Sequence, residues 1–128
     1  MKKLLISATM MILSSALLMA TPLGDVLAKA KGVNAAMVAE MRPEFAPNGL
    51  PIESGYIIGL PAGSDKDVQE AISALDKSLF YTQNGNERVF VDQTVDPCEI
   101  MYVLTVDGKT NIIFMQGSPD MVELMKAE

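Results

Sequence analysis

The sequence contains no histidine and no tryptophan, and it has a single cysteine among its 128 residues. Without histidine, the Ser-His-Asp and Cys-His arrangements of nucleophilic catalysis cannot form, and zinc loses its commonest nitrogen ligand. A single cysteine also excludes a Cys-x-x-Cys redox motif and any disulfide within the chain. These absences favour a protein that is not an enzyme, and we expect neither a cofactor nor a bound metal.

Clusters of basic residues are missing as well. The chain has 10 Lys and Arg against 16 Asp and Glu, which gives a formal charge of −6, and its basic residues are scattered. Binding of nucleic acid or of anionic lipid head groups needs a concentrated basic surface. We therefore expect no binding of nucleic acid. The acidity should serve solubility or a complementary basic partner.

The first 30 residues have the layout of a secretory signal peptide. Residues 1–3 are Met-Lys-Lys, and residues 4–20 form an apolar run of 17 residues that serine and threonine interrupt. Cleavage is expected after Ala30, which leaves small residues at positions −3 and −1; cleavage after Ala20 is the alternative, with Leu18 at −3. An uncleaved anchor is the rival interpretation, because 17 residues lie at the lower edge of a bilayer span. No cysteine closely follows the run, so a lipoprotein is excluded.

The remaining chain divides into a linker region and one compact domain. Residues 32–41 carry apolar side chains at near-helical spacing, which predicts a short N-terminal helix. Residues 42–51 contain three prolines and an Asn-Gly pair, which predict an irregular linker with Phe45 and Leu50 against the core. We therefore expect residues 31–54 to precede a single α+β domain that spans residues 55–128.

The domain opens with a predicted strand over residues 55–60 and an amphipathic helix over residues 64–78. Ser64 is a suitable N-cap for this helix, and acidic residues follow it in the first turn. One apolar stripe is expected to face the core, formed by Val68, Ala71, Ile72, Leu75 and Leu79.

Two hairpins are predicted after this helix. Asp107-Gly108 separates two apolar runs and is the stronger signal, because a type I′ turn needs positive φ at both central residues. Asn84-Gly85 predicts the other hairpin, between residues 79–82 and 88–91. With Asp107-Gly108 as the loop, both faces of the hairpin are apolar, so we expect it in the middle of a sheet covered on both sides. A single-sided sheet with apolar surface residues is the alternative.

A short C-terminal helix completes the predicted fold. Ser118 is its expected N-cap and Pro119 its first residue, and four apolar side chains are expected to face inward: Met121, Val122, Leu124 and Met125. The fold class is therefore α+β, with a small antiparallel or mixed sheet of two hairpins. One amphipathic helix and the short C-terminal helix should pack on this sheet.

The end of the chain resembles the C-terminal half of a thioredoxin-like domain. Pro97 precedes a predicted strand, which is followed by Asp107-Gly108, a second strand and a short helix. The resemblance covers about a quarter of the chain. It implies a degenerate thioredoxin-like arrangement whose redox role is lost, because the active-site dithiol of that family is missing.

Cys98, which follows Pro97, is the candidate site residue as a possible reactive thiol. An unpaired cysteine in an exported protein suggests intermolecular pairing, a reactive thiol or a small buried hydrophobe. Reactivity requires partial exposure and a depressed pKa, whereas the carboxylates of Asp96 and Glu99 beside it would raise the thiol pKa. Together with Asp92 they form an acidic cluster that can serve acid–base work, but solvated turn residues are the simpler interpretation.

These observations favour a small exported protein, periplasmic or secreted, that binds another protein of the cell envelope. It would act as a component of an assembly or secretion apparatus. The 10 methionines fit this expectation, because methionine suits adaptable surfaces. The alternative is a thioredoxin-like thiol redox or thiol-capture protein that uses Cys98. A membrane contact is expected only through an uncleaved signal, and the oligomeric state is left open.

Overall fold

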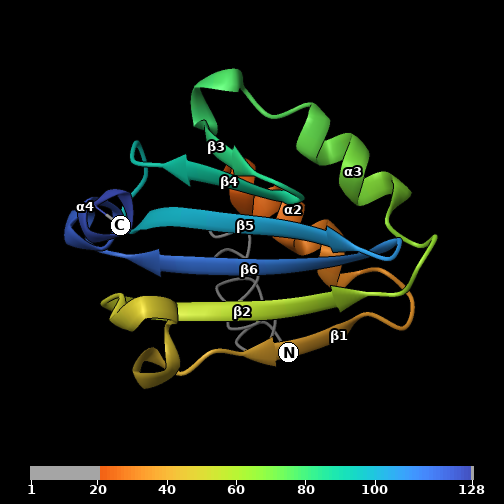
Figure 1. Cartoon of the computed structure of the whole chain (residues 1–128), viewed down its shortest axis with the longest axis horizontal. Coiled ribbons are helices and arrows are strands. Elements are labelled where there is room, and N and C mark those ends of the chain that lie inside the picture. Colours follow the sequence, from red (N-terminus) through yellow and green to blue (C-terminus); the bar gives the residue numbers. More distant parts are fainter. Residues whose placement is uncertain (1–20, 128) are drawn as a thin grey trace, which may run out of the picture.

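The computed structural model describes residues 21–127 and folds them into a six-stranded antiparallel sheet with three α-helices (Figure 1). The predicted α+β class is confirmed, and residues 1–20 of the predicted signal peptide, which spans residues 1–30, lie outside the described residues. The strand order is β1-β2-β6-β5-β4-β3, and every neighbouring pair is antiparallel. The strands are β1 (Met37–Glu40), β2 (Ile52–Leu60), β3 (Phe80–Asn84), β4 (Glu87–Asp92), β5 (Cys98–Val106) and β6 (Lys109–Gly117). The helices are α2 (Pro22–Lys31), α3 (Lys66–Ser73) and α4 (Pro119–Lys126), and short 3-10 turns are η1 (Pro43–Phe45), η2 (Pro47–Gly49) and η3 (Lys77–Leu79).

The hairpin of β5 and β6 occupies the centre of the sheet, as predicted. Val106 pairs with Lys109, and Val103 pairs with Ile112, which leaves Asp107 and Gly108 as the two loop residues. Both loop residues have positive φ, 53° and 74°, as a type I′ turn requires. The predicted two-residue loop, and the strand pairing that it implies, are confirmed.

The second hairpin forms, but its turn lies one residue later than predicted. Asn84 pairs with Glu87, so the loop residues are Gly85 and Asn86 instead of Asn84 and Gly85. Gly85 has a φ of 64°. The glycine therefore takes the first loop position, where a residue without Cβ adopts positive φ at no steric cost.

Two hydrophobic clusters lie on opposite faces of the sheet. The face that we call the helix face packs against α2 and α3, and its cluster includes Met101, Val103, Ile112 and Phe114, all fully buried. Figure 1 shows α2 behind the sheet, while α4 lies at the end where β5 begins and β6 ends. The other face, which we call the open face, packs against α4 and the loop around η2 at that end alone. At this end the described residues therefore cover the sheet on both sides.

Residues 21–41 differ from the predicted organisation. The expected helix over residues 32–41 is wrong, because Met37–Glu40 forms edge strand β1, paired with β2. The helix lies earlier, at Pro22–Lys31, where the Thr21 hydroxyl accepts a hydrogen bond from the backbone N–H of Gly24 at 2.9 Å. Helix α2 buries four side chains in the main core, those of Leu23, Val26, Leu27 and Ala30. The folded unit thus begins ahead of Ala30.

Helix α3 forms where it was predicted, with different ends. Its N-cap is Asp65, because the Ser64 hydroxyl donates to the Pro61 carbonyl at 2.6 Å instead of capping the helix. It ends at Ser73, after which Asp76 begins η3 by accepting from the backbone N–H of Ser78. The predicted apolar stripe packs into or against the core as expected.

Two side chains predicted to be buried are exposed. Phe45 is 71% exposed in η1, although Leu50 in the same loop is buried as expected. Leu124 is 51% exposed on α4, whereas Met121, Val122 and Met125 are buried. In an eight-residue helix the core-facing stripe is narrow, and Leu124 falls outside it.

Candidate functional site

The predicted site residue Cys98 lies at the first position of β5, on the open face, and is 4% exposed. Burial is the largest cause that raises the pKa of its thiol, and the negative charges of Asp96 and Asp92 add to this effect. Cys98 is thus neither exposed nor activated, and it packs as a small hydrophobe among Ile100, Met115 and their neighbours. These two observations disfavour the thiol-dependent alternative.

The acidic cluster beside Cys98 splits between solvent and core. Asp96 is exposed as expected, but Asp92 and Glu99 are each 1% exposed, so the prediction of solvated turn residues is wrong for them. The cause is strand register. Asp92 on β4 is the direct partner of Glu99 on β5, and both strands are covered at this end.

Gln116 and Ser54 extend this pair into a polar row across four strands. Glu99 is the partner of Gln116 on β6, and Gln116 is the partner of Ser54 on β2. The Gln116 side-chain N–H donates to Glu99 Oε2 at 3.1 Å, and the Ser54 hydroxyl donates to Gln116 Oε1 at 3.0 Å. Glu99 alternates with Met101 and Val103, so the row lies on the helix face, near the start of α2.

Burial raises the pKa of the Glu99 carboxyl, and the nearby Asp92 raises it further. Hydrogen bonds from the Thr21 and Gln116 side chains oppose that rise. One oxygen of each acid, Asp92 Oδ2 and Glu99 Oε1, is buried and accepts no hydrogen bond. This buried acid pair has no counterpart in the predictions from sequence.

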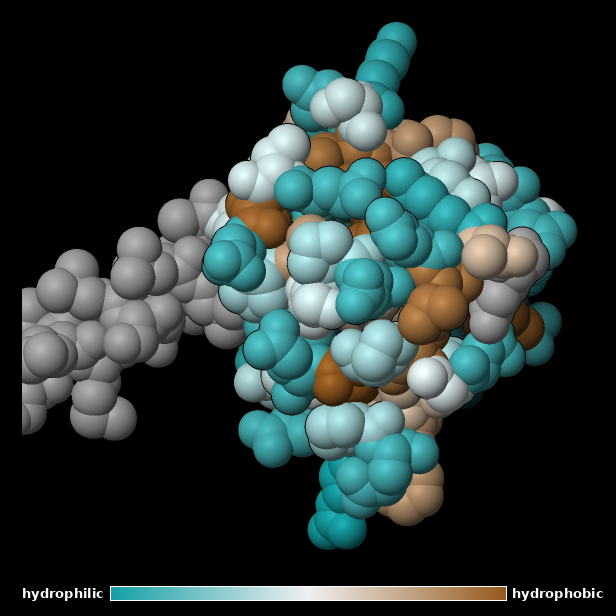
Figure 2. Space-filling model, turned by 90° about the vertical axis from the view of Figure 1, so that its left-hand side faces the viewer, coloured by the Kyte–Doolittle hydropathy of each residue, from teal (hydrophilic) through white to brown (hydrophobic). Residues whose placement is uncertain are grey.

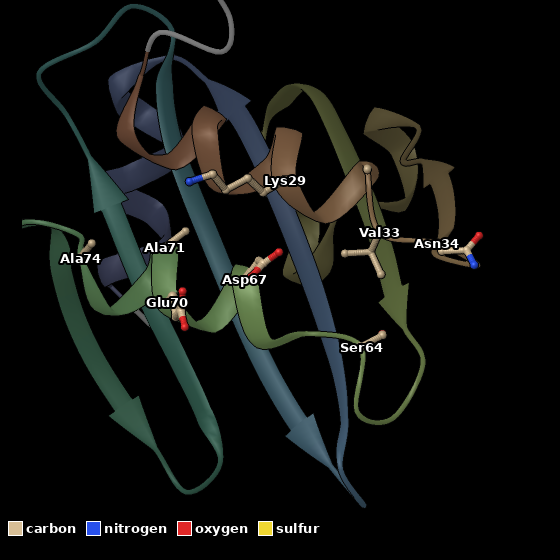
Figure 3. A pocket seen from close by; sticks show the side chains of 9 residues that line it. Lys29, Val33, Asn34, Ser64, Asp67, Glu70, Ala71 and Ala74 are labelled. Atoms are coloured by element: carbon tan, nitrogen blue, oxygen red, sulfur yellow. The ribbon is translucent and has the colours of Figure 1, made fainter.

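A groove of about 720 Å³ lies between α2 and α3 (Figure 3). Asp67 and Glu70 project into it from α3, and Lys29 reaches over it from α2. Both acids are exposed, and the Lys29 ammonium lies 3.5 Å from the Asp25 carboxylate on its own helix. The charged side chains that line the groove are thus exposed to solvent, and they do not form a site that is specific for one ligand.

A hydrogen-bond network fixes α3 on the sheet beside this groove. The Thr110 hydroxyl donates to Asp65 Oδ2 at 2.5 Å, and the Gln69 side chain donates to the same oxygen at 3.2 Å. Arg88 on β4 donates to Gln69 Oε1 at 2.8 Å. The Thr110 bond is the main cause that lowers the pKa of the Asp65 carboxyl.

The part of the open face beyond α4 carries a group of apolar side chains that are partly or largely exposed. This area, which we call the open half, consists of Ile57, Tyr102, Leu104, Val106 and Ile113, with Met37 at its β1 edge. Ile57 and Val106 are each 42% exposed, and Met37 is 77% exposed. At the covered end of the same face, the equivalent positions Ile100 and Met115 are fully buried under α4. Apolar side chains of the central hairpin thus continue along this face beyond the part that α4 covers.

A groove of about 670 Å³ runs along one side of the open half. It is lined by Pro47, Asn48, Tyr81, Thr82, Asn84, Glu87, Val89, Tyr102, Ile113 and Met125. Glu87 is the charged residue in this lining, so the groove combines apolar and aromatic walls with a negative charge. Figure 2 shows the neighbouring end of the molecule, where polar side chains cover most of the surface and apolar ones emerge between them.

Comparisons with protein-family models, with curated proteins and with solved structures found no match. The thioredoxin-like arrangement therefore stays a hypothesis. The structure does place Pro97 directly ahead of β5, and it places α4 directly after β6.

Within residues 21–127, no helix is long and apolar enough to cross a membrane. In the same part of the chain, no three His, Cys, Asp or Glu side chains converge on one point as a metal site. Among the described residues, the open half of the sheet and the buried Asp92–Glu99 pair remain as candidate sites.

Proposed function

We propose that this chain is a small exported protein without enzymatic activity that binds another protein of the cell envelope. The observation that carries the proposal is the open half of the sheet, where apolar side chains continue past the end of their cover. Exposed apolar surface of this kind is typical of protein-binding sites, and an isolated domain of this size has little apolar surface to spare.

The partner segment that fits this surface is apolar and carries positive charge. Its apolar side chains would pack on Leu104, Ile113 and Val106, and a basic side chain would face Glu87 in the adjoining groove. The whole chain has a formal charge of −6, which favours encounter with a basic partner over an acidic one.

Export by a cleaved signal peptide is part of the proposal, with cleavage after Ala20. This position keeps α2, whose four buried side chains complete the core of the helix face. Mass spectrometry of the exported protein tests the site directly: an N-terminus at Thr21 supports it, and an N-terminus at Lys31 contradicts it.

A paired binding assay tests the docking surface. The tagged exported protein, Leu104→Lys and Ser73→Lys would each be used to capture proteins from envelope extract. Leu104→Lys places a charge in the open half, whereas Ser73→Lys adds the same charge at an exposed position of α3. We expect the amount of one captured protein to fall at least about tenfold with Leu104→Lys, which corresponds to a loss of about 1.4 kcal/mol in binding free energy. With Ser73→Lys the captured amount should stay the same. Equal capture by both variants would contradict the proposal.

A further inference from the structure

The buried acid pair sits beside a cavity of about 470 Å³ at the start of α2. Asp92 lines this cavity together with the exposed Asp76 and three hydroxyl side chains, those of Thr21, Ser78 and Thr94. Its lining therefore offers carboxylate and hydroxyl oxygens, which are the ligands that hard cations prefer.

The hydrogen bonds around Asp92 leave one of its carboxylate oxygens available. Its Oδ1 accepts from the backbone N–H of Thr94 at 3.0 Å and from the Thr94 hydroxyl at 2.6 Å. Its Oδ2 is buried and accepts no bond. Asp92 as a whole is 1% exposed, so bulk water does not solvate this oxygen.

Glu99 repeats this pattern on the neighbouring strand. Its Oε2 accepts from Gln116, and its Oε1 is buried and accepts no bond. Asp92 and Glu99 are direct partners across β4 and β5, which places their Cβ atoms about 4.5–5.5 Å apart on the same face. The Thr21 hydroxyl, which bonds to Glu99, belongs to a residue that also lines the cavity. The two oxygens that accept no hydrogen bond, Asp92 Oδ2 and Glu99 Oε1, therefore lie in the same region of the helix face.

No positive charge of the described residues neutralises this pair. The ion pair formed within residues 21–127 is Lys29–Asp25 on the outside of α2. Buried carboxylates are normally paired with a cation or protonated, because an unpaired buried charge is costly. A bound cation would satisfy both free oxygens at once.

We propose that Asp92 and Glu99 bind a hydrated divalent cation, Ca²⁺ or Mg²⁺, in the cavity at the start of α2. Two carboxylates with nearby hydroxyls match a site in which the ion keeps several of its waters, because the remaining coordination positions are not filled by further acids. The pair of negative charges fits a divalent ion. The proposal is independent of the docking surface on the other face of the sheet.

Calorimetric titration and thermal unfolding of the exported protein test this site with CaCl₂ and MgCl₂, against NaCl of equal ionic strength. We expect saturable uptake of one ion per chain and a rise in Tm of at least about 3 °C at saturation. Asp92→Asn should abolish both effects, and Asp120→Asn, at an exposed position of α4, should keep them.

Glu99→Gln provides a second variant in case Asp92→Asn does not fold, and it should weaken uptake at least about tenfold. Absence of saturable uptake of both ions would overturn the proposal, as would uptake that persists unchanged in Asp92→Asn. A Tm that responds to pH but not to either ion would also overturn it, because the acid pair would then share a proton instead of binding a metal.

Discussion

At the scale of single residues, two backbone positions show how local geometry is fixed by sequence. Gly108 has a φ of 74° in the central turn, a region that costs an L-residue about 1–2 kcal/mol. Gly32 ends α2 with a φ of −81°, which any residue adopts. The two glycines therefore form a matched pair for the same substitution.

Gly108→Ala should lower the free energy of unfolding by about 1–2 kcal/mol, because alanine is strained at this φ. Gly32→Ala should change it by less than about 0.5 kcal/mol, since an added Cβ there meets only atoms at 3.6 Å. Urea denaturation of both variants measures the difference. Equal stabilities would show that the turn of the central hairpin is not the one described.

The carboxyl of Glu99 should make stability depend on pH. Its pKa is raised in the folded state above its ordinary value of 4.5, so the folded protein holds a proton that the unfolded chain releases. The stabilisation is fully present below pH 4.5 and is lost as the pH rises through the folded pKa. Asp92, Gln116 and the Thr21 hydroxyl are the groups that face this carboxyl.

Glu99→Gln should therefore be more stable than wild type at pH 8, in metal-free buffer, and this gain should shrink as the pH is lowered to about 4. Denaturation at a series of pH values, with EDTA present, provides the measurement. A gain that stays constant from pH 4 to pH 8 would mean that Glu99 has an ordinary pKa.

At the scale of elements, the attachment of α3 depends on a few polar contacts. The fully buried Thr110 donates to Asp65 at the start of this helix. Thr110→Val keeps the shape of the side chain and removes the donor. We expect it to destabilise the protein by about 1.5–3 kcal/mol, as is usual for a hydrogen bond to a charged group.

Thr105 is the direct partner of Thr110 on β5, and Thr105→Val is the matched control. It should cost less than about 1 kcal/mol, because Thr105 is only half-buried. The loss in Thr110→Val should also diminish at acidic pH, since the pKa of Asp65 is lowered and protonation removes the charged acceptor. A cost equal to that of Thr105→Val would contradict this role of Thr110.

Helix α2 should be required for folding. It buries Leu23, Val26 and Leu27 almost completely, and burial of each contributes about 1.5–3 kcal/mol. Their sum is comparable to the whole stability of a small domain, about 5–15 kcal/mol. A chain that begins at Thr21 should unfold cooperatively on heating, and one that begins at Lys31 should not. Circular dichroism melting of the two chains checks this, and equal cooperative transitions would contradict it.

The elements that could be predicted from the sequence are those fixed by short-range patterns. Asp107-Gly108 between apolar runs determined both the turn and the register of β5 and β6. The helix at Pro22–Lys31 was missed because its residues also fit the end of a signal peptide. Strand β1 was missed because Met37–Glu40 is a short edge strand with all side chains exposed, so it lacks the alternation that marks a strand.

At the scale of the whole molecule, the two candidate sites arise from contacts that single segments do not encode. Asp92 and Glu99 become a buried pair only because β4 and β5 align them and because α2 begins beside them. Their positions do alternate in phase with buried Phe90 and Met101, which is a signal that could have indicated inward-facing acids. The extent of cover on the open face depends on the length of α4, and no local pattern predicts it.

The half-covered sheet gives this molecule two distinct faces. Helices α2 and α3 cover the helix face, whereas the part of the open face that α4 covers ends near Tyr102. A partner that completes the open face would extend the core of this domain, much as α4 does at the other end. Binding and folding would then use the same kind of apolar packing.

Site-specific photocrosslinking in living cells tests this account most directly. A photoreactive amino acid would be placed at Leu104 in the open half, or at the exposed Ser73 of α3 as the control. We expect irradiation to link the protein that carries the photoreactive residue at position 104 to one discrete envelope protein, and to give no such product when that residue is at position 73. Absence of a product from Leu104, or the same product from both positions, would contradict it.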